Sequence, residues 1–317
     1  MENKEEIHLC LCWFDSDGSY SKFPATTIVS ILENNKTNKL RFHLITPDIS
    51  GENRQKIKKI IKDYQQEVVF YEKLNAKSLR ILNLIKENDQ STFGQGAYLR
   101  LLIPELISKR IKKVLYLDSD LIISGNLKEL WNMNLSSAYV LGANHENHPK
   151  IKEWGIKQYI NSGVLLMNLE RIREINLLKE LQKVYSAHKK DFYFVGMNSC
   201  ADQDLINLVF RENIGLINQK YNFAIRKGRF APGKIIYHYA VLFKPFRFKP
   251  CFIDKKYKEL YWKYFDKTPW VGWRPEWNLK KAFKTTSTYF FLVRIIKKFG
   301  LEKPLKKLLN KKKTKRI

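Results

Sequence analysis

The sequence predicts an α/β fold in which helices cover both faces of a mixed, mostly parallel sheet. Short apolar segments alternate with amphipathic ones along the first 120 residues, as in strand–helix–strand units. The chain has 317 residues, of which 44% are hydrophobic and 13% aromatic, enough to bury a large core. No G-x-G-x-x-G or Walker lysine motif follows the first strand, so a dinucleotide or P-loop site has no support.

The first elements follow one another regularly. Ile7–Phe14 has the apolar content of a buried strand, and Pro24 begins a helix that runs to Glu33. Gly51–Tyr64 has the apolar period of a helix. Further strands are expected at Leu40–Ile45, Glu67–Tyr71 and Lys113–Leu117, with a helix around Ala97–Ile103.

After residue 120 the elements become less regular. Gly163–Met167 is an apolar strand that leads into a long amphipathic helix, Leu169–Lys189. Asp202–Phe210 is expected to be a helix and Ile235–His238 a short strand.

The acidic triplet Asp118-Ser119-Asp120 directly follows the most apolar predicted strand. Two adjacent carboxylates repel each other, and burial disfavours their ionisation. A divalent cation relieves both costs, oxygen ligands suit Mg²⁺ or Mn²⁺, and ligands bind at strand ends in open α/β sheets. The spacing alone leaves a metal site and a solvated turn as alternatives.

Two further places could complete a site. Asp17 and Tyr20 follow the first strand, where a carboxylate can accept from a base N–H and an aromatic ring can stack. Taken alone, these residues fit a turn without ligand better. His238 ends a short strand six residues before Lys244. Taken alone it fits a hydrogen-bonded core histidine. With the acidic triplet it forms a set that suits Mn²⁺, and Lys244 could meet a diphosphate.

Six motifs occur in an order that resembles glycosyltransferase family 8, in particular its bacterial lipopolysaccharide glucosyl- and galactosyltransferases. The resemblance covers about residues 7–250. The motifs are Tyr98–Leu101, Leu115–Asp120, Asn161–Leu169, Asp202–Asp204, Tyr221–Phe223 and His238–Pro245.

The resemblance implies a GT-A fold and a retaining, metal-dependent transferase. The enzyme would move glucose or galactose from a UDP-sugar to a bacterial cell-surface glycan or glycolipid, such as lipopolysaccharide core. It also implies a role for each matching residue. These are Asp118, Asp120 and His238 as ligands of Mn²⁺ or Mg²⁺; Asp17, Ser19 and Tyr20 at the uridine; Arg100, Ser119, Asn161 and Ser162 at the donor; Lys244 at the diphosphate; and Asp202 and Gln203 as catalytic residues at the sugar.

Two positions depart from the family pattern. Val241 stands where the family has a glycine in its phosphate loop, and Ser19 stands where many members have asparagine. A β-branched residue does not readily adopt positive φ, so a catalytically impaired UDP-sugar-binding homologue is an alternative. Gln203 would be a poor nucleophile because an amide has no ionised oxygen. We therefore expect front-face substitution.

The basic charge is concentrated at the C-terminus. The net charge is +27, and residues 251–317 carry +15 of it. We expect a GT-A catalytic domain over 1–250 and a basic, aromatic-rich, helical C-terminal region over 251–317. Within that region, Tyr289–Phe299 has the pattern of a basic amphipathic helix, which predicts an anchor on the anionic inner face of the cytoplasmic membrane.

The same charge would suit a nucleic-acid-binding protein, but acidic strand ends would repel a phosphate backbone, and we expect no nucleic-acid partner. The N-terminus has no apolar signal-peptide region, and the four cysteines form no CxxC pair. These features predict free thiols and a cytoplasmic, peripherally membrane-associated protein.

Overall fold

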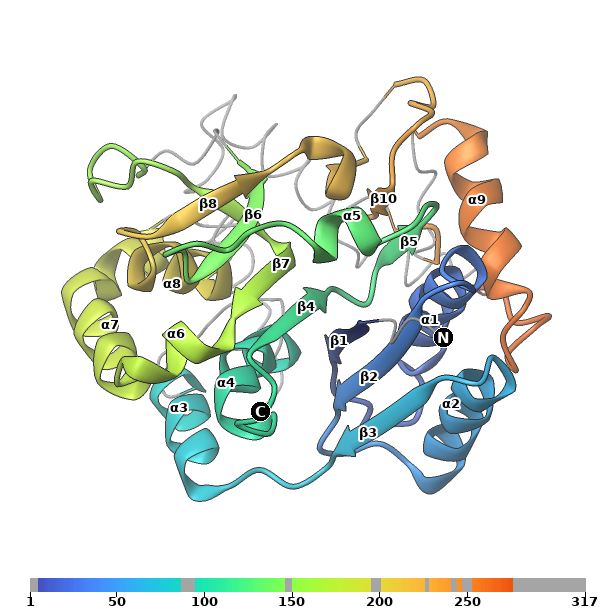
Figure 1. The fold of residues 1–317 in the computed structure, drawn as a ribbon, viewed down its shortest axis with the longest axis horizontal. Coiled ribbons are helices and arrows are strands. Elements are labelled where there is room, and N and C mark those ends of the chain that lie inside the picture. The colour runs from blue at the N-terminus through green and yellow to red at the C-terminus, as the bar shows by residue number, and fades with distance from the viewer. Residues whose placement is uncertain are drawn as a thin grey trace, which may run out of the picture.

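The computed structural model describes residues 5–86, 95–145, 150–194, 201–225, 228–240, 244–246 and 253–275 (Figure 1). Within these residues the main sheet has seven strands in the order β3-β2-β1-β4-β7-β6-β8. Its strands are β1 (Glu6–Cys12), β2 (Lys39–Ile45), β3 (Glu67–Tyr71), β4 (Lys113–Leu117), β6 (Val140–Asn144), β7 (Ile160–Asn168) and β8 (Ile214–Ile217).

Most strand pairs of this sheet are parallel, which confirms the predicted fold class. β1 pairs in parallel with both β2 and β4, β2 with β3, and β6 with β8. β7 is antiparallel to both of its neighbours, β4 and β6. A smaller sheet has the order β5-β10-β9 and consists of β5 (Leu121–Ile123), β9 (Phe223–Ala224) and β10 (Ile236–His238).

Helices pack on both faces of the main sheet, as predicted (Figure 1). Side chains alternate along β1: Leu9 and Leu11 join one core with α1 and α2, while Cys10 and Cys12, both free thiols, join a second core with α7 and α8. The helices are α1 (Lys22–Asn34), α2 (Gly51–Asp63), α3 (Ala76–Lys86), α4 (Ile103–Leu106), α5 (Lys128–Trp131), α6 (Leu169–Glu174), α7 (Leu177–Phe194), α8 (Ala201–Val209), α9 (Lys255–Phe265) and the 3₁₀ segments η1 (Gln95–Leu102) and η3 (Gln219–Tyr221).

Two predicted helices differ from the structure. The long helix Leu169–Lys189 is divided into α6 and α7, because Ile175 is extended and the Asn176 side chain caps a new helix by accepting from Lys179 N at 3.2 Å. The predicted helix around Ala97–Ile103 is mostly the 3₁₀ segment η1. There the Arg100 Nε group donates to the Ala97 carbonyl at 2.8 Å.

The beginning of the basic C-terminal region packs against α1. α9 lies beside α1 (Figure 1), and Tyr257, Tyr261 and Phe265 belong to the same buried core as that helix. Asn34 of α1 also donates to the Tyr264 hydroxyl at 2.9 Å. The predicted membrane anchor within 276–317 lies outside the described residues. In the part of the chain that is described, no helix has both the length and the apolar character needed to cross a bilayer.

Candidate active site

A cavity of about 660 Å³ opens where the carboxyl ends of β1 and β4 meet the start of β7. The end of β10, the first turn of α8 and the segment that carries Lys244 complete its wall. This is the edge of an α/β sheet at which ligands bind. The cavity is lined by Tyr20, Arg100, Asp118, Ser119, Asp120, Asn161, Ser162, Asp202, Gln203, His238 and Lys244, together with other residues.

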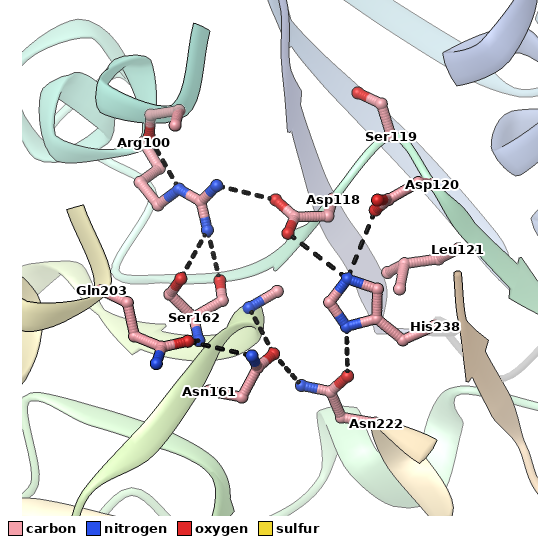
Figure 2. A network of polar contacts seen from close by, with 12 residues as sticks. Arg100, Asp118, Ser119, Asp120, Leu121, Asn161, Ser162, Gln203, Asn222 and His238 are labelled. Carbon is pink, nitrogen blue, oxygen red and sulfur yellow. Dashed lines mark hydrogen bonds and ion pairs between the residues drawn. The ribbon is translucent and has the colours of Figure 1, made fainter. Parts of the chain in front are cut away.

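Asp118, Asp120 and His238 come together on one side of this cavity (Figure 2). β10 pairs antiparallel with β5 so that His238 lies opposite Leu121, directly after the acidic triplet. His238 Nε2 is 3.8 Å from Asp118 Oδ2 and 3.3 Å from Asp120 Oδ1. One ligand atom from each residue can be chosen so that all lie within 4.8 Å of one another. Two carboxylates and an imidazole in this arrangement fit a divalent transition-metal ion.

Positive groups balance the two aspartates. Lys244 Nζ lies 2.7 Å from Asp120 Oδ2, and Arg100 lies 3.0 Å from Asp118 Oδ1. Burial opposes ionisation of Asp120, but the charges of Lys244 and His238 and their hydrogen bonds outweigh it and hold its pKa well below the usual range. The Asp120 side chain is therefore an anion, the form that a cation requires.

Arg100 links the carboxylate side of the cavity to its opposite wall. Its guanidinium group donates to Ser162 O at 2.7 Å and Ser162 Oγ at 2.9 Å (Figure 2). Its Nε also lies 3.3 Å from Asp202 Oδ2. Burial raises the pKa of Asp202, against the opposing charge of Arg100, and repulsion from Asp118 raises it further. The single positive charge of Arg100 thus lies between two carboxylates, the half-buried Asp118 and the buried Asp202.

The opposite wall is a network of amide groups. Gln203 Oε1 accepts from Asn161 Nδ2 at 2.9 Å and from Ser162 N at 3.1 Å, and Gln203 Nε2 donates to the Tyr159 hydroxyl at 3.1 Å. Both lone pairs of the Gln203 carbonyl oxygen are therefore engaged within the protein.

The three residues predicted to contact uridine, all in the turn after β1, differ in their position relative to the cavity. Tyr20 lines the cavity, whereas Asp17 and Ser19 are exposed and are not among its lining residues. The buried carboxylate of this turn is Asp15, which accepts from Tyr20 N at 2.5 Å and from Asn53 Nδ2 at 2.8 Å. Asp15 holds the turn in shape. The roles of Asp17 and Ser19 at a uridine remain predictions.

Sequence reasoning also missed Asn222 and Tyr116. Asn222 Oδ1 lies 2.9 Å from His238 Nδ1, and the Tyr116 hydroxyl donates to Asp118 Oδ1 at 2.5 Å. Both residues lie within motifs that resemble the family, so the sequence did draw attention to these segments. The order of the motifs does not show, however, which side chain forms a hydrogen bond to a metal ligand. Val241 lies outside the described residues.

Comparison with known proteins gives consistent matches. The family model "Glycosyl transferase family 8" matches residues 11–245. A lipopolysaccharide 1,2-glucosyltransferase of Escherichia coli is 27% identical over 213 residues, 65% of this chain and 60% of that protein. A lipopolysaccharide 1,3-galactosyltransferase of Salmonella typhimurium is 25% identical over 208 residues, 62% of this chain and 58% of that protein. The chain thus spans about three fifths of these relatives.

The likeness extends to solved structures. The galactosyltransferase LgtC, solved in complex with donor and acceptor sugar analogs, has a TM-score of 0.70 at 20% identity. The match covers 84% of this chain and 97% of that one. Together with the sheet order, this establishes the GT-A fold.

Proposed function

The chain belongs to glycosyl transferase family 8, and we propose that it is a retaining, metal-dependent hexosyltransferase using a UDP-sugar. The observation that carries the proposal is the placement of Asp118, Asp120, His238 and Lys244 on one side of a cavity whose other side presents Asp202 and Gln203. One side is suited to a diphosphate and the other to a sugar.

Cleavage of the anomeric bond leaves negative charge on the departing UDP. A divalent cation held by Asp118, Asp120 and His238 would act as a Lewis acid that neutralises this charge. The ammonium of Lys244, at the same edge of the cavity, adds a positive charge and a hydrogen-bond donor for a phosphate oxygen. The Tyr20 ring in the cavity wall supplies a surface on which the uracil base can stack.

Retention of configuration needs either a covalent intermediate or attack on the face from which UDP leaves. Gln203 has no ionised oxygen, and its carbonyl oxygen already accepts from Asn161 and from the Ser162 backbone. This engagement supports front-face substitution. The acceptor hydroxyl oxygen bonds to the anomeric carbon as the phosphate oxygen leaves, and the hydroxyl proton passes to that phosphate oxygen. Asp202 and Gln203 orient the sugar.

The acceptor proposed is a bacterial cell-surface glycan or glycolipid such as lipopolysaccharide core. The names of the two lipopolysaccharide glycosyltransferases support this choice, with glucose and galactose both remaining as donor sugars. The +15 charge of residues 251–317 supports a peripheral position on the anionic cytoplasmic membrane surface, where a lipid-linked acceptor would be found.

The test is UDP release by the full chain from a panel of UDP-sugars, with Mn²⁺ and with EDTA. We expect release from one sugar, abolished by EDTA and by Asp120→Asn. Asp63→Asn, on an exposed surface, serves as a matched control that also removes a carboxylate. UDP binding without release, even when lipopolysaccharide-core acceptors are added, would instead favour the catalytically impaired homologue. Absence of UDP binding would contradict the proposal.

A further inference from the structure

We infer that Asn222 is a positioning residue, which keeps a proton on His238 Nδ1 and so leaves Nε2, the atom that faces the two aspartates, to bind a cation. It also joins this side of the cavity to the amide network around Gln203 (Figure 2). The inference rests on the proposed function for the cation that Nε2 would bind. The hydrogen bond between Asn222 and the imidazole is a property of the metal-free protein.

Two backbone N–H groups determine the direction of every hydrogen bond in this network. Gly163 N can only donate, and it lies 3.0 Å from Asn161 Oδ1, which identifies that atom as the oxygen. The Asn222 atom that faces the same oxygen at 2.7 Å must therefore be its Nδ2 group. Likewise, Ser162 N donates to Gln203 Oε1, so Asn161 presents its Nδ2 group to Gln203.

The orientation of Asn222 then decides the tautomer of His238. With Nδ2 directed to Asn161, the Asn222 atom at 2.9 Å from His238 Nδ1 is the carbonyl oxygen, which can only accept. Nδ1 must therefore carry a proton, and Nε2 is the ring nitrogen whose lone pair a cation can use. Nε2 is the atom that faces Asp118 Oδ2 and Asp120 Oδ1, so the lone pair is directed to where a cation would be held.

Burial gives this arrangement its importance. Asn222 is 3% exposed and His238 4% exposed, so bulk water has little access to replace the amide. The ring also has no room to turn away on the Gly163 side, where even a methyl group would lie 2.4 Å from Cε1. Packing thus fixes the plane of the imidazole, and Asn222 fixes which nitrogen is protonated.

The test uses Asn222→Val, which removes the acceptor, and Asn222→Asp, which keeps an acceptor for Nδ1 but loses the donor to Asn161. The His238 tautomer is read from ¹⁵N chemical shifts of the metal-free protein at pH 8.5, and Mn²⁺ affinity from calorimetry. For Asn222→Val we expect a tautomer mixture and a loss of Mn²⁺ affinity of about 10- to 100-fold, typical of lost outer-shell partners. Asn222→Asp should keep the proton on Nδ1 and lose less Mn²⁺ affinity than Asn222→Val, while its KM for the donor rises because the hydrogen bond to Asn161 is lost.

Asn35→Val is the matched control, because Asn35 is equally buried and hydrogen-bonded through both amide atoms but lies at the end of α1. It should lower the melting temperature and leave the tautomer and Mn²⁺ affinity unchanged. Unaltered tautomer and affinity in Asn222→Val would overturn the inference. If that variant does not fold, loss of the Nδ1–H tautomer in Asn222→Asp would overturn it instead. Neither readout uses a sugar, so a lack of transferase activity in the wild type would contradict the proposed function alone.

Discussion

Gly163 of β7 lies against the His238 ring, and Gly163→Ala would test whether the imidazole must stand where the structure places it. A Cβ atom at this position would lie 2.4 Å from His238 Cε1 and 2.9 Å from Nδ1. Non-bonded carbons prefer about 3.5 to 4.0 Å, so one group must move by roughly 1 Å. The β7 backbone is held in place because the Gly163 carbonyl accepts from Asp118 N at 2.9 Å. The ring should therefore move, and its Nε2 with it.

This displacement should lower both the stability of the protein and its affinity for Mn²⁺. Overpacking of a closely packed site costs about 1 to 3 kcal/mol of unfolding free energy. A ligand nitrogen displaced by roughly 1 Å should weaken Mn²⁺ binding by about 10- to 100-fold, the range seen when the supports of a ligand are lost. Activity measured at a fixed, subsaturating Mn²⁺ concentration should fall by a similar factor.

Calorimetric Mn²⁺ titration and thermal unfolding would separate these two effects. Gly142→Ala is the matched control, since a Cβ at Gly142 of β6 would lie 2.6 Å from Ile160 Cδ1, and its three nearest neighbours are all atoms of Ile160 rather than of a proposed metal ligand. The control should lower the melting temperature without weakening Mn²⁺ binding. If Gly163→Ala binds Mn²⁺ as tightly as the wild type while the control behaves as expected, the assignment of His238 as a ligand is wrong.

Three further outcomes are expected. Lys244→Gln should lower the rate of UDP release roughly 100-fold or more, because a hydrogen-bond donor to the developing phosphate charge is lost. The activity that remains should still be sensitive to EDTA, and a wild-type rate in this variant would contradict the role of Lys244. Gln203→Glu should lower turnover about 10-fold or more, because the new side chain cannot donate to Tyr159, and full activity would exclude a specific amide role. Burial is the main cause that raises the pKa of Asp204 to about 7, above the unfolded value of about 3.9. The folded state then binds more protons between those values, so this group should make unfolding free energy fall by up to about 1.4 kcal/mol per pH unit from about pH 4 to 7. Denaturant unfolding at pH 5 and pH 8 should show that Asp204→Asn is the more stable protein at pH 8, and an equal pH response in both proteins would refute this.

The elements best predicted from the sequence are those whose local pattern matches their final environment. The ends of β3 and β4 agree with the prediction residue for residue, and β4 is almost entirely buried, so that its apolar sequence reads directly as a strand. The α6–α7 division depended on one residue, Asn176, whose capping bond competes with a continuous amphipathic pattern. The aromatic residues of α9 were visible in the sequence, but their burial requires α1, more than 200 residues earlier.

The candidate site divides in the same way. The sequence was sufficient to predict the three proposed metal ligands Asp118, Asp120 and His238. Carboxylates and imidazoles are common metal ligands, and these three residues stand at or directly after strand ends, within motifs that occur in a fixed order. Asn222 could not be predicted in this way, because an asparagine near the end of a short turn fits many places, and its role appears only when β7 brings Asn161 beside it from 61 residues away. Within the first turn, Asp15 and Asp17 are both aspartates and both follow β1 closely. They differ because Asn53 of α2 donates a hydrogen bond to Asp15, which is the buried one of the two. Long-range hydrogen bonds of this kind therefore decide which polar residue supports the site and which faces solvent.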